Sequence, residues 1–203
     1  MRSLNRNFPF PLRAFFAVVL LFFAQAALAN QCDWGDAEIT GRPLADQGPT
    51  EVSMRRYILD ITSIHDVDQS FVADVFFRAE WKDPRLAHEG LEPCSADLTR
   101  VWTPVLQLLN RRQIERVREP EVLVSPGGDV AFILRSYGDF SFRADLTDFP
   151  FDQQQLGFKI VSTFGEEDVR LITRPEMIGM ADTRTVGNWR VSFADTRTMS
   201  HYI

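Results

Sequence analysis

The sequence predicts an all-β protein, an immunoglobulin-like β-sandwich of about ten strands. Short segments with alternating apolar and polar residues follow one another along the chain, turn-forming residues separate them, and a helical period is almost absent. The 203 residues are enough for one domain with a substantial core, and the 17 phenylalanines suit a β-rich interior. The ordinary balance of 45% hydrophobic and 25% charged residues indicates a folded chain.

Residues 1–29 have the pattern of a secretory signal peptide. A positively charged start precedes the apolar run from Ala14 to Ala24, and Ala27-Leu28-Ala29 forms a small-residue cleavage site. The alternative is an N-terminal membrane anchor, but the run is short for a hydrocarbon core of roughly 30 Å. We therefore expect one exported domain over residues 30–203.

The only two cysteines are Cys32 and Cys94. Because export leads to an oxidising compartment, we favour a disulfide between them over two free buried thiols. Such a bridge closes a long loop and is worth ~4 kcal/mol in the chain-entropy model. Two cysteines without a nearby histidine pair argue against a metal site.

The first two strands are expected near Val52–Ile61 and Phe71–Trp81. In the first, Tyr57, Leu59 and Ile61 should share one face. A polar turn over residues 62–70 follows and contains Asp66 and Asp68. In the second strand, every odd-numbered residue is apolar, which predicts one buried and one wet face.

Phe76 lies on the polar face of that second strand. It is either a single surface aromatic, which is common, or a ring presented to a ligand or a partner subunit.

The segment after this strand reads W-x-D-x-R-L, with Trp81, Asp83 and Arg85. Asp83 and Arg85 can pair with each other or bond the turn backbone, with Trp81 beneath them, so we expect a structural role. A second motif, W-x-P followed by asparagine, contains Trp102, Pro104 and Asn110.

Several further segments are predicted from their composition. The basic stretch 111–118 is expected to be a solvated loop or edge strand rather than an anion site. Turn chemistry over residues 125–129 predicts a hairpin between Val122–Val124 and Val130–Leu134. An acidic turn over residues 165–168, a strand at 169–172, a loop at 175–187 and a strand from Trp189 are expected later.

The most distinctive stretch surrounds Phe149, Pro150, Phe151 and Asp152. Alternation before and after it predicts strands at 140–146 and 156–160, and Pro150 marks a loop between them. Two phenylalanines in a loop suggest a tip that packs against another domain or a membrane surface.

No catalytic constellation is present in the sequence. The three histidines are scattered over loops, and no nucleophile, phosphate-binding or dinucleotide-binding motif occurs. Turn capping explains Asp145, Asp148 and Asp152 more simply than a carboxylate pair. We expect no enzyme and no cofactor, and the net charge of −6 argues against a nucleic-acid partner.

The three motifs occur in an order that resembles the pentameric ligand-gated ion channels, the Cys-loop receptor superfamily. The third motif is F-P-F-D-x-Q, from Phe149 to Gln154, and the resemblance runs from Val52 to Phe193 and includes Trp189. In animal members two cysteines bracket this loop. Here Phe142 and Leu156 stand at those positions, and because bacterial members also lack the bridge, the resemblance is to the bacterial type.

The resemblance implies an extracellular ligand-binding domain of a homopentameric channel, at the periplasmic or extracellular face of the membrane. A small-molecule agonist would bind between neighbouring subunits, with Leu109, Thr163 and Phe164 on the principal face and Phe76 on the complementary face. Leu109 replaces the aromatic residue of animal receptors, which argues against an acetylcholine-like cation–π box.

The same resemblance places Asp66, Asp68 and the Phe149–Asp152 loop toward the membrane, where they would couple binding to a pore domain. The last strand and four membrane helices of the family are missing, so the domain is expected to be C-terminally incomplete. The main alternative is a secreted soluble binding protein with the same sandwich and no channel. A truncated, inactive product is a third reading.

Overall fold

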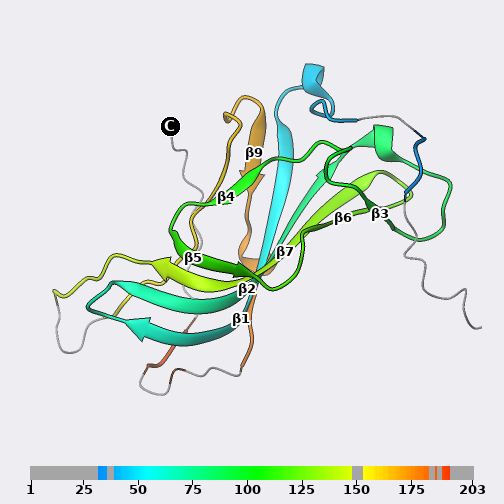
Figure 1. Ribbon diagram of the computed structural model, residues 1–203. Coiled ribbons are helices and arrows are strands. Elements are labelled where there is room, and N and C mark those ends of the chain that lie inside the picture. The colour runs from blue at the N-terminus through cyan, green and yellow to red at the C-terminus, as the bar shows by residue number, and fades with distance from the viewer. Residues whose placement is uncertain (1–31, 36–38, 148–152, 183–185, 187–188, 193–203) are drawn as a thin grey trace, which may run out of the picture.

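The computed structural model describes residues 32–35, 39–147, 153–182, 186 and 189–192 (Figure 1). The expected signal peptide and the Phe149–Asp152 loop lie outside the described residues. Within them, the expected all-β fold is confirmed, because strands and three short 3-10 helices are the only regular elements. No helix in this part of the chain is long and apolar enough to cross a membrane.

The larger sheet has the strand order β10-β1-β2-β7-β6-β3, with β9 also paired to β1 and β5 also paired to β7. The smaller sheet pairs β4 with β8. The strands are β1 (Thr50–His65), β2 (Ser70–Lys82), β3 (Cys94–Ala96), β4 (Leu106–Leu108), β5 (Arg111–Arg116), β6 (Glu121–Val124), β7 (Asp129–Ser141), β8 (Ile160–Ser162), β9 (Val169–Ile172) and β10 (Ile178–Met180). The 3-10 helices are η1 (Ala45–Gln47), η2 (Pro84–Leu86) and η3 (Pro175–Met177).

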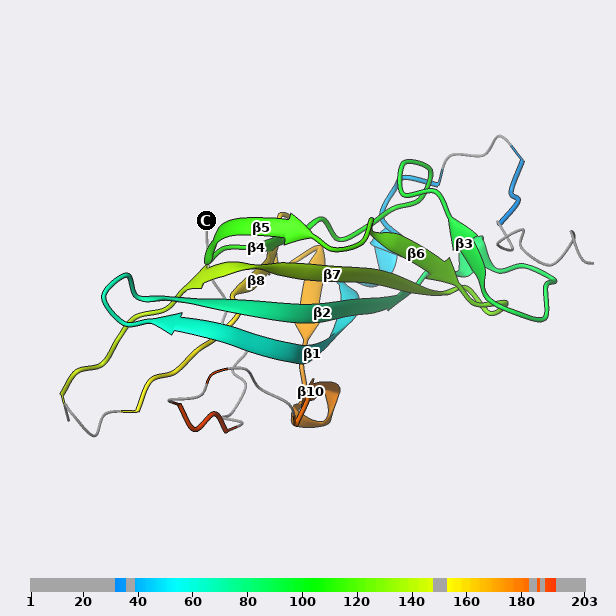
Figure 2. The ribbon, with the colours of Figure 1, turned by 60° about the horizontal axis from the view of Figure 1, so that its bottom comes forward.

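The three long strands β1, β2 and β7 form the centre of the molecule and lie side by side along their length (Figure 2). Every second residue of β2, from Phe71 to Trp81, is buried, as its alternation predicted. The β6–β7 hairpin forms where the turn chemistry predicted it. The basic stretch forms the edge strand β5, which pairs with β7 alone.

The buried residues form two clusters. One is built around Trp81 and Trp102, whose rings meet edge to face with centroids 5.7 Å apart. The other is built around Phe71, Phe140 and the half-buried Phe158, and the Phe140–Phe158 centroids are 4.8 Å apart. Tilted and edge-to-face geometries of this kind stabilise aromatic cores beyond the area that they bury.

The expectation that Tyr57, Leu59 and Ile61 share one face is wrong. The pairing of β1 with β2 shifts register between Ile58 and Asp60, and again between Ile61 and Ser63. A bulge moves later side chains to the opposite face. Ile61 is therefore buried, whereas Tyr57 is 42% exposed on the outer face.

Three expectations about the second half of the chain are also wrong. Residues 142–147 and 153–159 flank the undescribed loop without forming strands, because neither segment has a ladder partner. The expected loop 175–187 contains β10, which pairs in parallel with β1. Residues 189–192, including Trp189, are not in a strand.

Candidate functional site

The candidate site is a cleft of about 620 Å³ on the outer face of β1, β2 and β7. Its floor and rim combine two aromatic rings, aliphatic side chains and three charged residues. The lining residues are Tyr57, Leu59, Phe76, Val117, Arg118, Glu119, Ile133 and Arg135.

Strand register brings the central residues together. Tyr57 of β1 lies directly opposite Phe76 of β2, and Phe76 lies directly opposite Arg135 of β7. Residues that face each other across neighbouring strands have Cβ atoms about 5 Å apart, so these side chains form one row across the sheet. The segment after β5, from Val117 to Glu119, closes one side of the cleft.

The two arginines of the cleft are held in ion pairs. Arg135 donates two hydrogen bonds to Asp74, at 3.1 and 2.7 Å, and these bonds raise the pKa of Arg135. Arg118 lies 2.7 Å from Glu121. These ion pairs neutralise the two arginines and leave polar groups around an apolar floor. A cleft of this kind suits a small molecule with an apolar body and polar ends.

Glu80 lies further along the same face of β2, and two arginines bind it. Arg55 and Arg78 each donate a hydrogen bond of 2.8 Å to its carboxylate. Burial acts to raise the pKa of Glu80, but the bonds from Arg78 and Arg55 outweigh it, and the pKa lies below its ordinary value.

The structure does not bring the other expected ligand contacts to this cleft. Phe76 lines it, whereas Leu109, Thr163 and Phe164 do not. Leu109 is 50% exposed and Thr163 is exposed, at opposite ends of the β4–β8 pair. Phe164 packs against Trp102, with ring centroids 5.7 Å apart, so part of its ring is used in the core.

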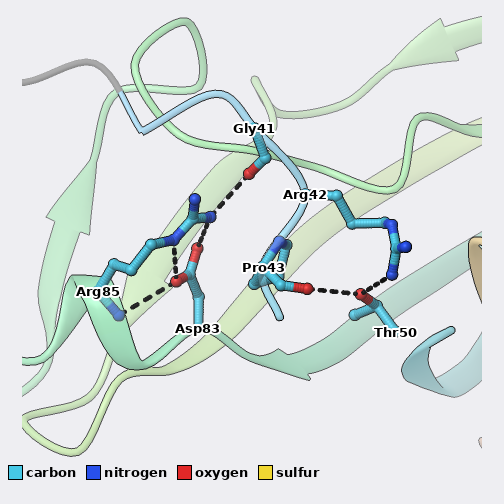
Figure 3. A network of polar contacts seen from close by, with 6 residues as sticks. All are labelled: Gly41, Arg42, Pro43, Thr50, Asp83 and Arg85. Atoms are coloured by element: carbon cyan, nitrogen blue, oxygen red, sulfur yellow. Dashed lines mark hydrogen bonds and ion pairs between the residues drawn. The ribbon is translucent and has the colours of Figure 1, made fainter. Parts of the chain in front are cut away.

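The W-x-D-x-R-L segment forms an ion pair between a buried aspartate and a partly exposed arginine (Figure 3). The Asp83 side chain is fully buried and accepts hydrogen bonds of 2.8 and 2.7 Å from the Arg85 guanidinium, which raise the pKa of Arg85. Asp83 also accepts from the backbone N–H of Arg85 and so caps η2. Arg85 then donates to the carbonyl of Gly41, which links η2 to the segment before β1.

Cys32 and Cys94 form the expected disulfide, with Cα atoms 5.0 Å apart. No group of three or more histidine, cysteine, aspartate or glutamate side chains that could hold a metal occurs among the described residues.

The β1–β2 turn and the arms of the undescribed loop lie together at the end of the molecule away from this disulfide (Figures 1 and 2). Asp66 and Asp68 are exposed in this turn. The neighbouring Gln69 accepts hydrogen bonds from the backbone N–H groups of Phe142 and Ala144. Asp145 caps its own turn by accepting from Thr147, and these bonds lower the pKa of Asp145.

Sequence reasoning found one of the eight cleft residues, Phe76. Tyr57 and Leu59 were assigned to the same face as Ile61 because the bulge in β1 leaves no local signal. Arg135 was missed because its position opposite Phe76 depends on the register of β7, although an arginine within an apolar strand was a visible exception.

Comparison with known proteins identifies the family. Residues 38–201 match the model of the neurotransmitter-gated ion-channel ligand binding domain. The chain belongs to this family. The motifs that pointed to the Cys-loop receptors therefore reflect a real relationship, and the two-sheet fold is that of a member of this family.

Relatives of this ligand-binding-domain chain include channels from bacteria and animals. The proton-gated ion channel of Gloeobacter violaceus is 25% identical over 166 residues, covering 78% of this chain and 45% of the relative. A glycine receptor subunit beta-type 4 of Caenorhabditis elegans is 30% identical over 139 residues, covering 64% and 29%. The neuronal acetylcholine receptor subunit beta-4 of Bos taurus is 23% identical, covering 69% and 30%. The chain thus spans less than half the length of these relatives.

Proposed function

We propose that this chain is the extracellular ligand-binding domain of a bacterial-type pentameric ligand-gated ion channel. A small-molecule agonist binds between neighbouring subunits and shifts the channel between closed and open states in proportion to its differential affinity for them. The chain is exported by residues 1–29 and acts at the periplasmic or extracellular face of the membrane. We propose no catalytic role and no cofactor.

The observation that carries this proposal is the cleft around Phe76. It is open, faces outward and lies on the sheet face rather than inside the sandwich. The ring of Phe76 is half-buried at a position where the polar face of β2 offers no other aromatic. An outward cleft of this kind supports a half-site that a second subunit completes.

The second half of the site is assigned to Leu109, Thr163 and Phe164. Leu109 and Thr163 are exposed next to the two ends of the β4–β8 pair, and neither lines the cleft. In a head-to-tail ring, one surface of each subunit meets a different surface of the next, so two separate half-sites on one chain are what a closed ring requires.

Cross-linking tests this arrangement. Cysteine at Leu109 and cysteine at Arg118, on the assembled full-length protein, should join neighbouring subunits into a ladder ending at five when oxidised. Leu91→Cys, on an exposed loop residue outside both surfaces, is the matched control. If the cysteines at Leu109 and Arg118 give no cross-linked subunits, or if only the Leu91→Cys control does, the proposed interface is contradicted.

Current recording tests the channel itself. Membranes carrying the complete gene product should pass ion currents when protons, glycine or acetylcholine, or a wider panel of small amines and amino acids, are applied. The secreted-binding-protein alternative predicts soluble protein and no current. Absence of current across the panel, with protein present at the cell surface, would favour that alternative.

A further inference from the structure

Asn110 uses its whole side-chain amide to join two distant segments. It is 7% exposed in the turn between β4 and β5. Its Nδ2 donates to the carbonyls of Ser141 and Gly157, each at 2.8 Å, and its Oδ1 accepts from the N–H of Lys159 at 2.9 Å. An asparagine amide has two donor hydrogens and an acceptor oxygen with two lone pairs, so both donors and one of the two acceptor positions are used.

The partners of Asn110 are the two arms of the loop that contains Phe149–Asp152. Ser141 is the last residue of β7, and Gly157 and Lys159 lead into β8. The arms have no ladder hydrogen bonds along residues 142–147 and 153–159. The amide therefore fixes the distance between the arms at their base, where regular strand pairing does not.

Strand β5, which follows the turn that contains Asn110, contacts the β1–β2 turn. Arg112 donates to the carbonyl of Asp68 at 2.6 Å. Gln69 accepts from the N–H of Phe142 at 2.9 Å and, through Oε1, from the N–H of Ala144 at 3.2 Å. The β1–β2 turn is thus bonded to the first arm and to β5.

The turn that contains Asn110 also holds the exposed Leu109. The N–H of Leu109 donates to the carbonyl of Lys159 at 2.8 Å, and the N–H of Lys159 donates back to the Asn110 side chain. A shift of Leu109 therefore displaces the second arm directly.

We propose that Asn110 is a positioning residue that makes Leu109, the β1–β2 turn and the two loop arms move as one unit. If one arm leaves, the amide of Asn110 loses one or more of its three hydrogen bonds to the arms, and this cost opposes separate movement of the arms. The use of this unit in gating rests on the proposed function, whereas the mechanical linkage does not.

Hydrogen exchange of the chain tests the linkage. In Asn110→Ala, the N–H of Lys159 loses its acceptor and the carbonyls of Ser141 and Gly157 lose their donor. If these bonds keep the arms together, the amides of residues 141–147 and 157–159 should exchange at least about tenfold faster than in the unsubstituted chain. Exchange in β2 should change only as much as global stability does. Ser162→Ala is the matched control, because the part-buried hydroxyl of Ser162 donates to the carbonyl of Pro104 at 2.7 Å and accepts from the N–H of Phe164 at 3.1 Å, and neither partner lies in the arms.

A second variant keeps the test decisive if Asn110→Ala does not fold. Gln69→Ala removes an exposed bond and should speed exchange at Ala144 while leaving Lys159 protected. Asn110→Asp retains an acceptor for Lys159 but loses the two donors. In the folded double variant Gln69→Ala with Asn110→Asp, the exchange rates of both arms should rise by more than the sum of the increases in the two single variants.

Equal acceleration in Asn110→Ala and Ser162→Ala, or strictly additive effects of the Gln69 and Asn110 substitutions, would overturn the proposal. The outcome is independent of the channel assignment. Faster exchange confined to the arms, without any agonist current, would support the linkage and contradict the proposed function. An agonist current without faster exchange in the arms would support the proposed function and contradict the linkage.

Discussion

The two ends of the sandwich are stabilised by different means. At the end near β3 and η2, a disulfide, a pair of tryptophans and the fully buried Asp83 tie the segments before β1 and after β2 together. At the end with the β1–β2 turn, Phe142 and Phe158 of the loop arms pack against Phe71, and side-chain bonds from Asn110 and Gln69 also hold the arms. The first end is a cross-linked frame, whereas the described part of the second end is held by packing and hydrogen bonds without a covalent link, and it is expected to open at lower free energy.

This difference fits the proposal that ligand binding at the sheet is coupled to the β1–β2 turn and the loop arms. Such coupling requires the cross-linked end to stay fixed while the other end moves. The following variants test whether the ends differ as described, from the largest expected effect to the smallest.

Phe71→Ala should have the largest effect. Phe71 is fully buried and its ring lies 5.6 Å from those of both Phe140 and Phe158. Removing it should lower the free energy of unfolding by about 3–5 kcal/mol, as for other buried phenylalanines. Denaturant titration measures this. Phe76→Ala, on the outer face of the same strand, is the control and should lie near the unsubstituted chain; equal losses would reassign Phe76 to the core.

Removing the disulfide should destabilise the frame next most strongly. The double substitution of Cys32 and Cys94 by serine opens a loop of 62 residues and should cost about 2–5 kcal/mol. Thermal unfolding measures the loss. Exchange should rise around β3 and not in the loop arms, residues 142–147 and 153–159; a rise centred on these arms would contradict the separation of the two ends.

Asp83→Ala should cost about 2–3 kcal/mol, because it removes the η2 cap and leaves Arg85 without its charge partner. Urea midpoints compared with those of Arg85→Lys check the reason. Lysine cannot reproduce the paired bonds but keeps the charge, so its loss should be the smaller. If Arg85→Lys were the more damaging substitution, the contact of Arg85 with Gly41 would matter more than the ion pair.

Glu80 gives the smallest effect, visible in the acid dependence of stability. Because its folded pKa lies below its ordinary value, its contribution is present above the unfolded pKa of about 4.3 and is lost as pH falls through the folded pKa. Glu80→Gln should therefore flatten the decline of stability below about pH 4.5, and added salt should do the same. Glu51→Gln, at a carboxylate 4.0 Å from Arg170, is the control. If Glu80→Gln leaves the dependence of stability on pH unchanged, the bonds from Arg55 and Arg78 do not contribute to stability in solution.

Local patterns were enough for some of this molecule. The alternation of β2, the β6–β7 hairpin, the edge strand β5 and the Cys32–Cys94 bridge follow from residues close in sequence or from the compartment. The three motifs also pointed to the family.

What the sequence could not supply depends on long-range pairing. The bulge in β1 turns Tyr57 toward the cleft, and β10 forms only because residues far along the chain pair with β1. Gly179 of β10 lies so close to the Tyr57 ring that a side chain there would clash, which no local pattern indicates. Likewise, the motif marked Asn110 as important, but its three partners lie 31 to 49 residues away.

The central claim is that the Phe76 cleft is half of an agonist site, and a concentration–response curve tests it most directly. In the full-length channel, Phe76→Ala should shift the half-activating concentration of an agonist at least about tenfold, the scale of one lost aromatic contact. Tyr137→Ala, an exposed aromatic outside the cleft on the neighbouring β7, should leave it unchanged. Equal responses of the two variants, at equal surface expression, would contradict the account.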